Sequence, residues 1–261
     1  NFLKEVYPRV LIFLLLILFF FQILNFRSFI YSIIGGYYLR LLIIILLAFK
    51  EYKFNFIFNF KDFSKDWIKY SFFIFLSAFA ASIIIDIDKS MISKLLALEN
   101  VAYYAVAVFI AAVIDTPSRA MFQIVNPLVS EAISNNDKNR LEDLLKKSSM
   151  SLFLISGLIF LLINTNIGDI YNVVESINKI QGYSIAIPVV LIISISKLYT
   201  STIGCMNNII SNSNFYQYIL FFSIFSALSL FFLNIYFIKN IGLVGAAYST
   251  LIIIVFFNLL K

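Results

Sequence analysis

The stretch IIIDIDKSMISKLLALEN (83–100), followed directly by VAYYAVAVFIAAVIDTPSRAMFQIVNPLVSEA (101–132), carries ionisable side chains inside two strongly apolar segments. These side chains are Asp86, Asp88, Lys89, Asp115 and Arg119. Charges at membrane depth are costly, so they usually face the interior of a helix bundle or a wet cavity. We therefore interpret the two segments as membrane helices that line a polar cavity, as in a transporter.

The composition extends this interpretation to the whole chain. The 261 residues are 61% hydrophobic and only 13% charged, with a mean hydropathy of +0.94. The apolar residues fall in blocks of roughly 18–25, the length that spans the hydrocarbon core of a bilayer as a helix. We predict an all-α, polytopic transmembrane helical bundle with about eight spans.

The expected spans cover most of the chain, and charged segments separate them. We place them at residues 6–24, 29–49, 67–97, 101–130, 149–166, 183–210, 215–237 and 242–260. Residues 135–147 read as an amphipathic helix, either on the membrane surface or as a solvated connector. Residues 164–182 read as an outer loop in which Asp169 and Glu175 are solvated.

The charge pattern and the missing residue types exclude several classes of function. Lys and Arg residues concentrate in loops 51–66 and 134–148, which the positive-inside rule assigns to the cytoplasm. The net charge of +6 therefore points to membrane topology and not to nucleic acid. The sequence has no His, one Cys and no GxxxxGK[ST] motif, so we expect no metal site, no cofactor and no enzymatic activity.

Three of the expected helices each carry one mainly polar stripe with a cation on it or beside it. The stripes contain Ser82, Asp86, Ser90 and Ser93 beside Lys89; Asp115, Arg119 and Asn126; and Ser194, Lys197, Ser201, Gly204 and Asn208. We expect the three stripes to face one hydrated cavity. The alternative is local ion pairing, Asp86 with Lys89 and Asp115 with Arg119, that merely joins helices.

Several short motifs resemble the polysaccharide-transporter branch, the Wzx-type oligosaccharide flippases, of the multidrug/oligosaccharidyl-lipid/polysaccharide flippase superfamily. They are Asp88-Lys89, Asn100-Val-Ala-Tyr-Tyr-Ala-Val-Ala, Thr116-Pro-Ser-Arg-Ala, Gln123-Ile-Val-Asn-Pro, Ser130-Glu-Ala, Leu141–Ser149 and Ile241-Gly-Leu-Val-Gly-Ala-Ala. The similarity runs from about Trp67 to the end of the chain. Because the chain begins with Asn1 and ends directly after an apolar run, we expect it to be part of a longer protein.

The resemblance implies two bundles with about twelve to fourteen helices in all. Residues 1–50 would hold the last two helices of the N-terminal bundle, 51–66 the cytoplasmic inter-bundle loop, and 67–261 the six-helix C-terminal bundle. Such proteins flip polyprenyl-pyrophosphate-linked oligosaccharides across the bacterial inner membrane for surface polysaccharides such as O-antigen.

The resemblance also suggests roles for the ionic and polar residues. The substrate diphosphate would bind the cations Arg40, Lys89, Arg119 and Lys197. The cavity lining, or a site for a coupling proton or sodium ion, would comprise Asp86, Asp88, Asp115, Asn126, Ser201 and Asn208. Alternatives are a multidrug or cation antiporter of the same superfamily, a membrane glycan polymerase, and a structural scaffold without transport activity.

Overall fold

The structure, a computed structural model, describes residues 6–51, 65–178 and 182–260. Throughout these ranges the chain forms helices and no strand. Five helices, counting Glu99–Ser134 as one, are long and apolar enough to cross a membrane. Tyr7–Phe20, Ile68–Phe79 and Leu243–Leu259 are shorter apolar helical segments. The predicted all-α membrane bundle is confirmed.

The chain divides into two compact units, residues 1–62 and 63–261. In the first unit, α1 (Tyr7–Phe20) and α2 (Phe26–Glu51) form a helical hairpin. The Tyr7 hydroxyl donates to the Gly36 carbonyl at 3.1 Å, which ties the two helices together. Most of the predicted loop 51–66 lies outside the described residues, and its role between two bundles stays a prediction.

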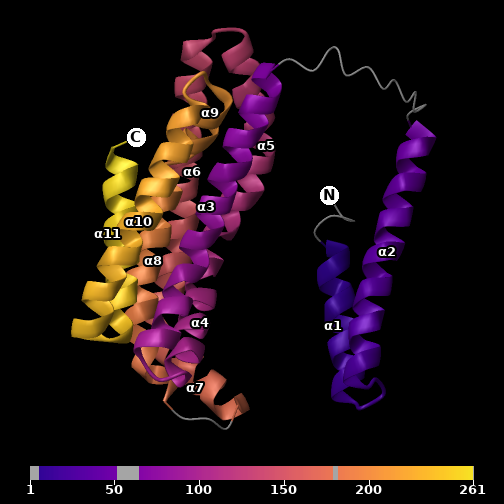
Figure 1. Ribbon diagram of the computed structural model, residues 1–261, viewed down its shortest axis with the longest axis vertical. Coiled ribbons are helices and arrows are strands. Elements are labelled where there is room, and N and C mark those ends of the chain that lie inside the picture. The colour runs from indigo at the N-terminus through magenta and orange to yellow at the C-terminus, as the bar shows by residue number, and fades with distance from the viewer. Residues whose placement is uncertain (1–5, 52–64, 179–181, 261) are drawn as a thin grey trace. The chain divides into compact units, whose positions relative to one another are not determined.

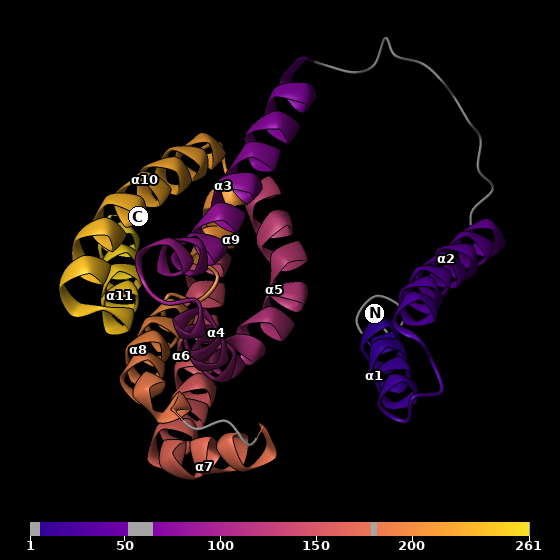
Figure 2. The ribbon, with the colours of Figure 1, turned by 60° about the horizontal axis from the view of Figure 1, so that its bottom comes forward.

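The second unit is a bundle of long helices with two short helices near its ends (Figures 1 and 2). Its α-helices are α3 (Lys65–Leu95), α4 (Glu99–Ala112), α5 (Thr116–Ser134), α6 (Lys138–Thr165), α7 (Ile167–Asn178), α8 (Ile187–Thr202), α9 (Met206–Asn212), α10 (Tyr216–Ile241) and α11 (Leu243–Leu259). Helix α8 is central, because α4, α6 and α11 all pack against it, and α3 pairs mainly with α10.

The predicted helix 101–130 is interrupted, in contrast to our expectation. A 3-10 turn, η3 (Val113–Asp115), separates α4 from α5, and Pro117 lies in the first turn of α5. Proline has no amide hydrogen to donate, and its ring clashes with the carbonyl four residues earlier, here Val113. The proline therefore begins a new helix instead of continuing α4, and Asp115 lies at the junction.

The predicted helix 183–210 is also interrupted. Helix α8 ends at Thr202, and Gly204 adopts a left-handed conformation with φ +62°. The Cys205 amide then donates to the Ser148 hydroxyl of α6 at 3.1 Å, and α9 follows. The chain turns tightly here because Gly204 lacks a side chain, which would contact Ser148 and Ser149.

Two segments between the predicted spans are helical: the first was expected to be an amphipathic helix, whereas the second was expected to be a loop. The Asp137 carboxylate caps α6 by accepting from the Arg140 amide at 3.0 Å, so residues 138–165 form one helix with no separate surface segment. Leu141, Leu144 and Leu145 pack against a small core formed by Val125, Val129 and Cys205. These leucines form the apolar side of the expected amphipathic helix, and charged residues such as Glu142 and Lys146 are exposed on its other side.

The predicted outer loop contains the amphipathic helix α7. Its Tyr171 is buried against the main core of the bundle. Glu175 accepts hydrogen bonds from the amides of Gly182 (3.2 Å) and Ser184 (3.1 Å), so its carboxylate is not merely solvated.

Replacing Gly204 should destabilise the bundle. In Gly204→Ala, the new Cβ would lie 2.7 Å from the Ser148 hydroxyl and 2.8 Å from the Ser149 amide nitrogen, on a backbone that disfavours L-residues. We expect a loss of about 1–3 kcal/mol, measured by thermal unfolding of the purified protein in detergent. The control is Gly168→Ala in α7, where a Cβ would meet nothing within 4 Å. Equal melting temperatures for the two variants would contradict this account of the turn.

Candidate functional site

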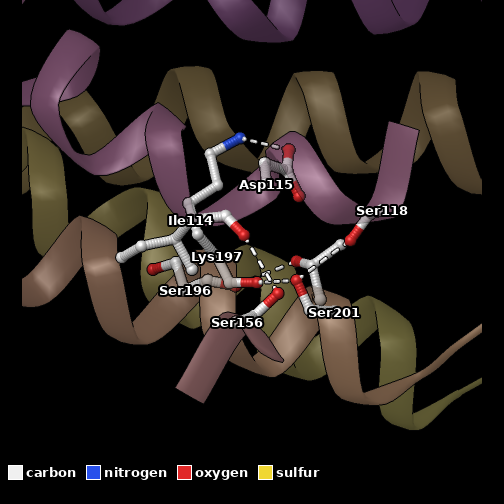
Figure 3. A network of polar contacts seen from close by, with 8 residues as sticks. Ile114, Asp115, Ser118, Ser156, Ser196, Lys197 and Ser201 are labelled. Carbon is white, nitrogen blue, oxygen red and sulfur yellow. Dashed lines mark hydrogen bonds and ion pairs between the residues drawn. The ribbon is translucent and has the colours of Figure 1, made fainter. Parts of the chain in front are cut away.

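An ion pair joins the two interrupted helices. Lys197 of α8 lies 3.3 Å from the Asp115 carboxylate in η3, and the side chains are 29% and 21% exposed (Figure 3). The 3-10 turn places Asp115 directly before the first turn of α5, beside the middle of α8. The predicted residues Asp115 and Lys197 are therefore brought together, whereas the predicted alternative pairing of Asp115 with Arg119 is not formed.

Serine hydroxyls near this ion pair bond to one another and to backbone carbonyls. The hydroxyls of Ser118 and Ser201 lie 3.2 Å apart, and Ser201 donates to the Lys197 carbonyl at 3.0 Å. Ser156 of α6 donates to the Ile114 carbonyl at 3.0 Å, within the 3-10 turn (Figure 3). Polar groups inside a bilayer need such partners, because the hydrocarbon supplies none. The network thus stabilises the interruption and links η3, α5, α6 and α8.

The charges of α3 separate into two environments. Lys89 pairs with Asp86 at 3.0 Å within the same helix, and the Asp86 side chain is 70% exposed. This is the local pairing that we considered as an alternative, and exposed pairs of this kind contribute little stability. Asp88, two residues away, points instead into the bundle and is only 4% exposed.

Asp88 receives three hydrogen bonds from three other helices. One carboxylate oxygen accepts from the Tyr104 hydroxyl of α4 (2.6 Å) and the Thr250 hydroxyl of α11 (2.7 Å). The other accepts from the Asn234 amide nitrogen of α10 at 2.6 Å. No ion pair reaches Asp88 among the described residues. Within this part of the chain Asp88 is therefore held by neutral donors and by no lysine or arginine.

The buried site around Asp88 also holds an unused acceptor. Asn234 is completely buried, and its Oδ1 accepts no hydrogen bond in the described structure. A buried carbonyl oxygen without a partner is costly, as is a buried carboxylate without a compensating positive charge. Both costs would fall if a cation entered among these oxygens. The arrangement is therefore suited to hold a proton or a small cation.

Three asparagines form a further polar cluster. The Asn126 Oδ1 of α5 accepts from the amide nitrogens of Asn208 (3.2 Å) and Asn212 (3.0 Å) of α9. The predicted residues Asn126 and Asn208 are thus in contact, through an amide cluster that contains no charge.

Two of the predicted cations form no ion pair among the described residues. Arg119 lies on the exposed face of α5 and forms no ion pair with any described residue. Arg40 belongs to the first unit, where its Nε is buried without a hydrogen bond. The ionic residues of the second unit therefore form separate sites, and no described contact joins the Asp86–Lys89 pair to the Asp115–Lys197 pair.

Tyr104, Asn234 and Thr250, which hold Asp88, were not predicted as site residues. Asn234 did carry a signal, since it is an isolated amide within the apolar run SLFFLNIYFI (229–238) of α10. A lone polar residue at membrane depth is a functional candidate in its own right.

A double-mutant cycle should show how strongly the Asp115–Lys197 pair couples the interrupted helices. We expect Asp115→Asn and Lys197→Met each to cost about 1–3 kcal/mol, because each leaves a partly buried charge alone. The double variant should cost less than the sum of both. Thermal unfolding in detergent measures these losses of stability. The control is Asp86→Asn, which breaks the exposed pair and should cost only about 0–1 kcal/mol. Strictly additive losses would contradict the coupling.

Comparison with known proteins supports the fold. No protein-family model and no curated protein matches the chain. Among solved structures, the chain is similar to the outward-facing conformation of a multidrug resistance MATE family transporter of the MOP superfamily, with a TM-score of 0.56 and 17% sequence identity. The match covers 74% of this chain and 43% of that transporter, so the chain spans less than half of its length. At this identity the similarity establishes a shared helical fold.

Proposed function

We propose that this chain is part of a cation-coupled transporter of the multi-pass membrane class, with Asp88 as the coupling site. The observation that carries the proposal is the buried carboxylate of Asp88 beside the unused Asn234 Oδ1. The similarity in fold to a transporter supports the same class of function. Helices that meet at such a site can change their packing when the ion enters or leaves.

The coupling ion is a proton or Na⁺. Asp88, Asn234, Thr250 and Tyr104 supply carboxylate, amide and hydroxyl oxygens from four helices. Hard cations prefer oxygen ligands of this kind. Either ion would neutralise the carboxylate, and Na⁺ would also use the Asn234 Oδ1. Binding would then draw α3, α4, α10 and α11 together.

For the substrate we propose a polyprenyl-pyrophosphate-linked oligosaccharide, flipped across the bacterial inner membrane by alternating access of two bundles. The diphosphate would be attracted by Arg119 and Lys197, whereas roles for Arg40 of the first unit and for Lys89, which pairs with Asp86, stay predictions. Arg119 is exposed and forms no ion pair with a described residue, so its guanidinium is available to an anion. Lys197 would leave its ion pair with Asp115 and bind the phosphate instead.

A multidrug antiporter is the second candidate. The solved transporter with a similar fold is described as a multidrug resistance protein, and Asp86 is an exposed carboxylate that a cationic compound could contact. Lys89 neutralises this carboxylate locally, which weakens its attraction for a cation. Resistance profiles of cells with and without the protein would separate the two candidates.

Removing the Asp88 carboxylate should abolish the response to the coupling ion. We expect Na⁺ to raise the melting temperature of the purified protein relative to choline, or an imposed proton gradient to drive proton entry into proteoliposomes containing a pH-sensitive dye. Asp88→Asn should lose whichever response the parent protein shows, and Asp86→Asn, an exposed carboxylate on the same helix, should retain it. A parent protein that responds to neither ion, or a response that survives in Asp88→Asn, would refute the coupling site.

The cationic residues can be tested by transport itself. In proteoliposomes with a labelled polyprenyl-pyrophosphate saccharide, Arg119→Ala and Lys197→Ala should each slow flipping by about tenfold or more, since a charge-assisted contact to phosphate is worth about 1.5–3 kcal/mol. Lys146→Ala is the control, because Lys146 is 73% exposed at the start of α6 and pairs with Glu142. Unchanged flipping in both test variants would exclude a role for these cations.

A further inference from the structure

A groove of about 310 Å³ lies between α3, α9 and α10, apart from every charged site described above. Its polar lining consists of Ser77, Asn207, Asn208, Ser211 and Ser223, and its remaining lining residues are apolar. No ionisable side chain lines it. The amide cluster continues this polar surface, because Asn208 is bonded to Asn126 of α5.

On α3 the groove borders the apolar helical segment Ile68–Phe79, and polar side chains in such segments are costly to expose to lipid. Ser77 is about 18 Å along α3 from Lys65 at about 1.5 Å per residue. A second groove of about 350 Å³ between α3 and α10 is lined only by apolar residues such as Phe79, Ile83 and Phe231, which suits contact with lipid tails. The polar groove is therefore the side of this helix pair that is suited to water or to a polar ligand.

The groove has both hydrogen-bond donors and acceptors that no described residue uses. Asn208 donates to Asn126, but its own Oδ1 accepts no hydrogen bond among the described residues. The Ser223 hydroxyl has no partner there either, and it can both donate and accept. A ligand hydroxyl, which also donates and accepts, is complementary to this pair. A phosphate would find no cation in this lining, and a cationic compound would find no carboxylate.

Aromatic rings lie next to the groove. The Tyr70 hydroxyl donates to the carbonyl of the lining residue Ser211 at 3.3 Å. The Tyr70 and Tyr216 rings pack edge to face with centroids 4.8 Å apart, and Phe73 contacts Tyr216. These rings lie outside the groove lining and support it from beside Ser211. The amides and hydroxyls of the lining, with no charge among them, suit an uncharged ligand that bears several hydroxyl groups.

We infer that this groove binds a neutral, hydroxyl-rich headgroup, namely a saccharide unit of the transported substrate. The inference rests on the proposed function, because it assigns the sugar and the diphosphate to different sites. The amides and hydroxyls of the groove contact the sugar, while Arg119 and Lys197 attract the phosphates. The groove then contributes to the choice among glycans.

Binding of soluble sugars tests the inference directly. The probes are methyl α-glucopyranoside, N-acetylglucosamine and glucose 1-phosphate, added to the protein in nanodiscs and followed by saturation-transfer NMR. Asn208→Leu replaces the amide by an apolar side chain with the same number of heavy atoms. Ser223→Leu fills the groove without changing the amide cluster. The matched control is Asn166→Leu, an exposed asparagine at the end of α6, outside the groove lining.

We expect at least one of the two uncharged sugars to bind, and both test variants to weaken that binding by tenfold or more while Asn166→Leu leaves it unchanged. Melting temperatures close to that of the parent protein would show that the variants fold. Binding of glucose 1-phosphate alone, binding unaffected in both variants, or no sugar binding at all would overturn the inference. If the parent protein binds sugar but responds to neither Na⁺ nor protons, the coupling proposal is contradicted and the assignment of the groove remains.

Discussion

Polar groups inside a bilayer have to find their partners within the protein, and this constraint shapes the whole second unit. The clearest case is the interrupted pair of helices. At η3 the helical hydrogen bonding stops, and the Ser156 hydroxyl donates to the Ile114 carbonyl. At Gly204 the chain turns, and the Ser148 hydroxyl accepts from the Cys205 amide. Both of these hydroxyls come from α6, so one continuous helix supports two discontinuous ones.

The same constraint distinguishes the carboxylates. Asp86 and Asp115 each have a lysine partner, and both pairs retain contact with solvent. Asp88 is buried among hydroxyl and amide donors with no lysine or arginine bonded to it in the described structure. Hydrogen bonds from neutral groups reduce the cost of a buried charge but leave the charge in place. This is why Asp88, and not the more conspicuous ion pairs, is the best-supported place for a mobile cation.

Much of the fold follows from the sequence, because blocks of apolar residues at membrane length allow few alternatives. The helix interruptions were harder to predict. Pro117 signals an interruption, but a proline is also tolerated within a membrane helix when neighbouring groups satisfy the freed carbonyls. Gly204 was read as one member of a polar stripe, whereas its role depends on the close approach of Ser148 and Ser149 from a distant part of the chain.

Prediction of the candidate site from the sequence was limited for the same reason, because its contacts join distant parts of the chain. Helical periodicity correctly grouped Lys197 with Ser201 on one face of α8, yet it could not tell which helix that face meets. Asp115 and Arg119 were placed on one stripe, with a local ion pair as the alternative, but Asp115 contacts Lys197 of α8 across the bundle. Partners such as Asn234 and Thr250 come from helices far along the chain, and periodicity within one helix carries no information about them.

The two interruptions also divide the packing of the bundle. Helices α4 and α8 contribute to the main core, whereas α5 and α9 share a smaller core around Val125, Val129 and Cys205. The bonds from Asn126 to α9 reinforce this second association. Helix α6 reaches both cores, because its Leu141, Leu144 and Leu145 pack on the smaller one and its Ile163 lies in the main one. The two halves of the bundle are therefore joined by one unbroken helix, although two of its neighbours are interrupted between the same cores.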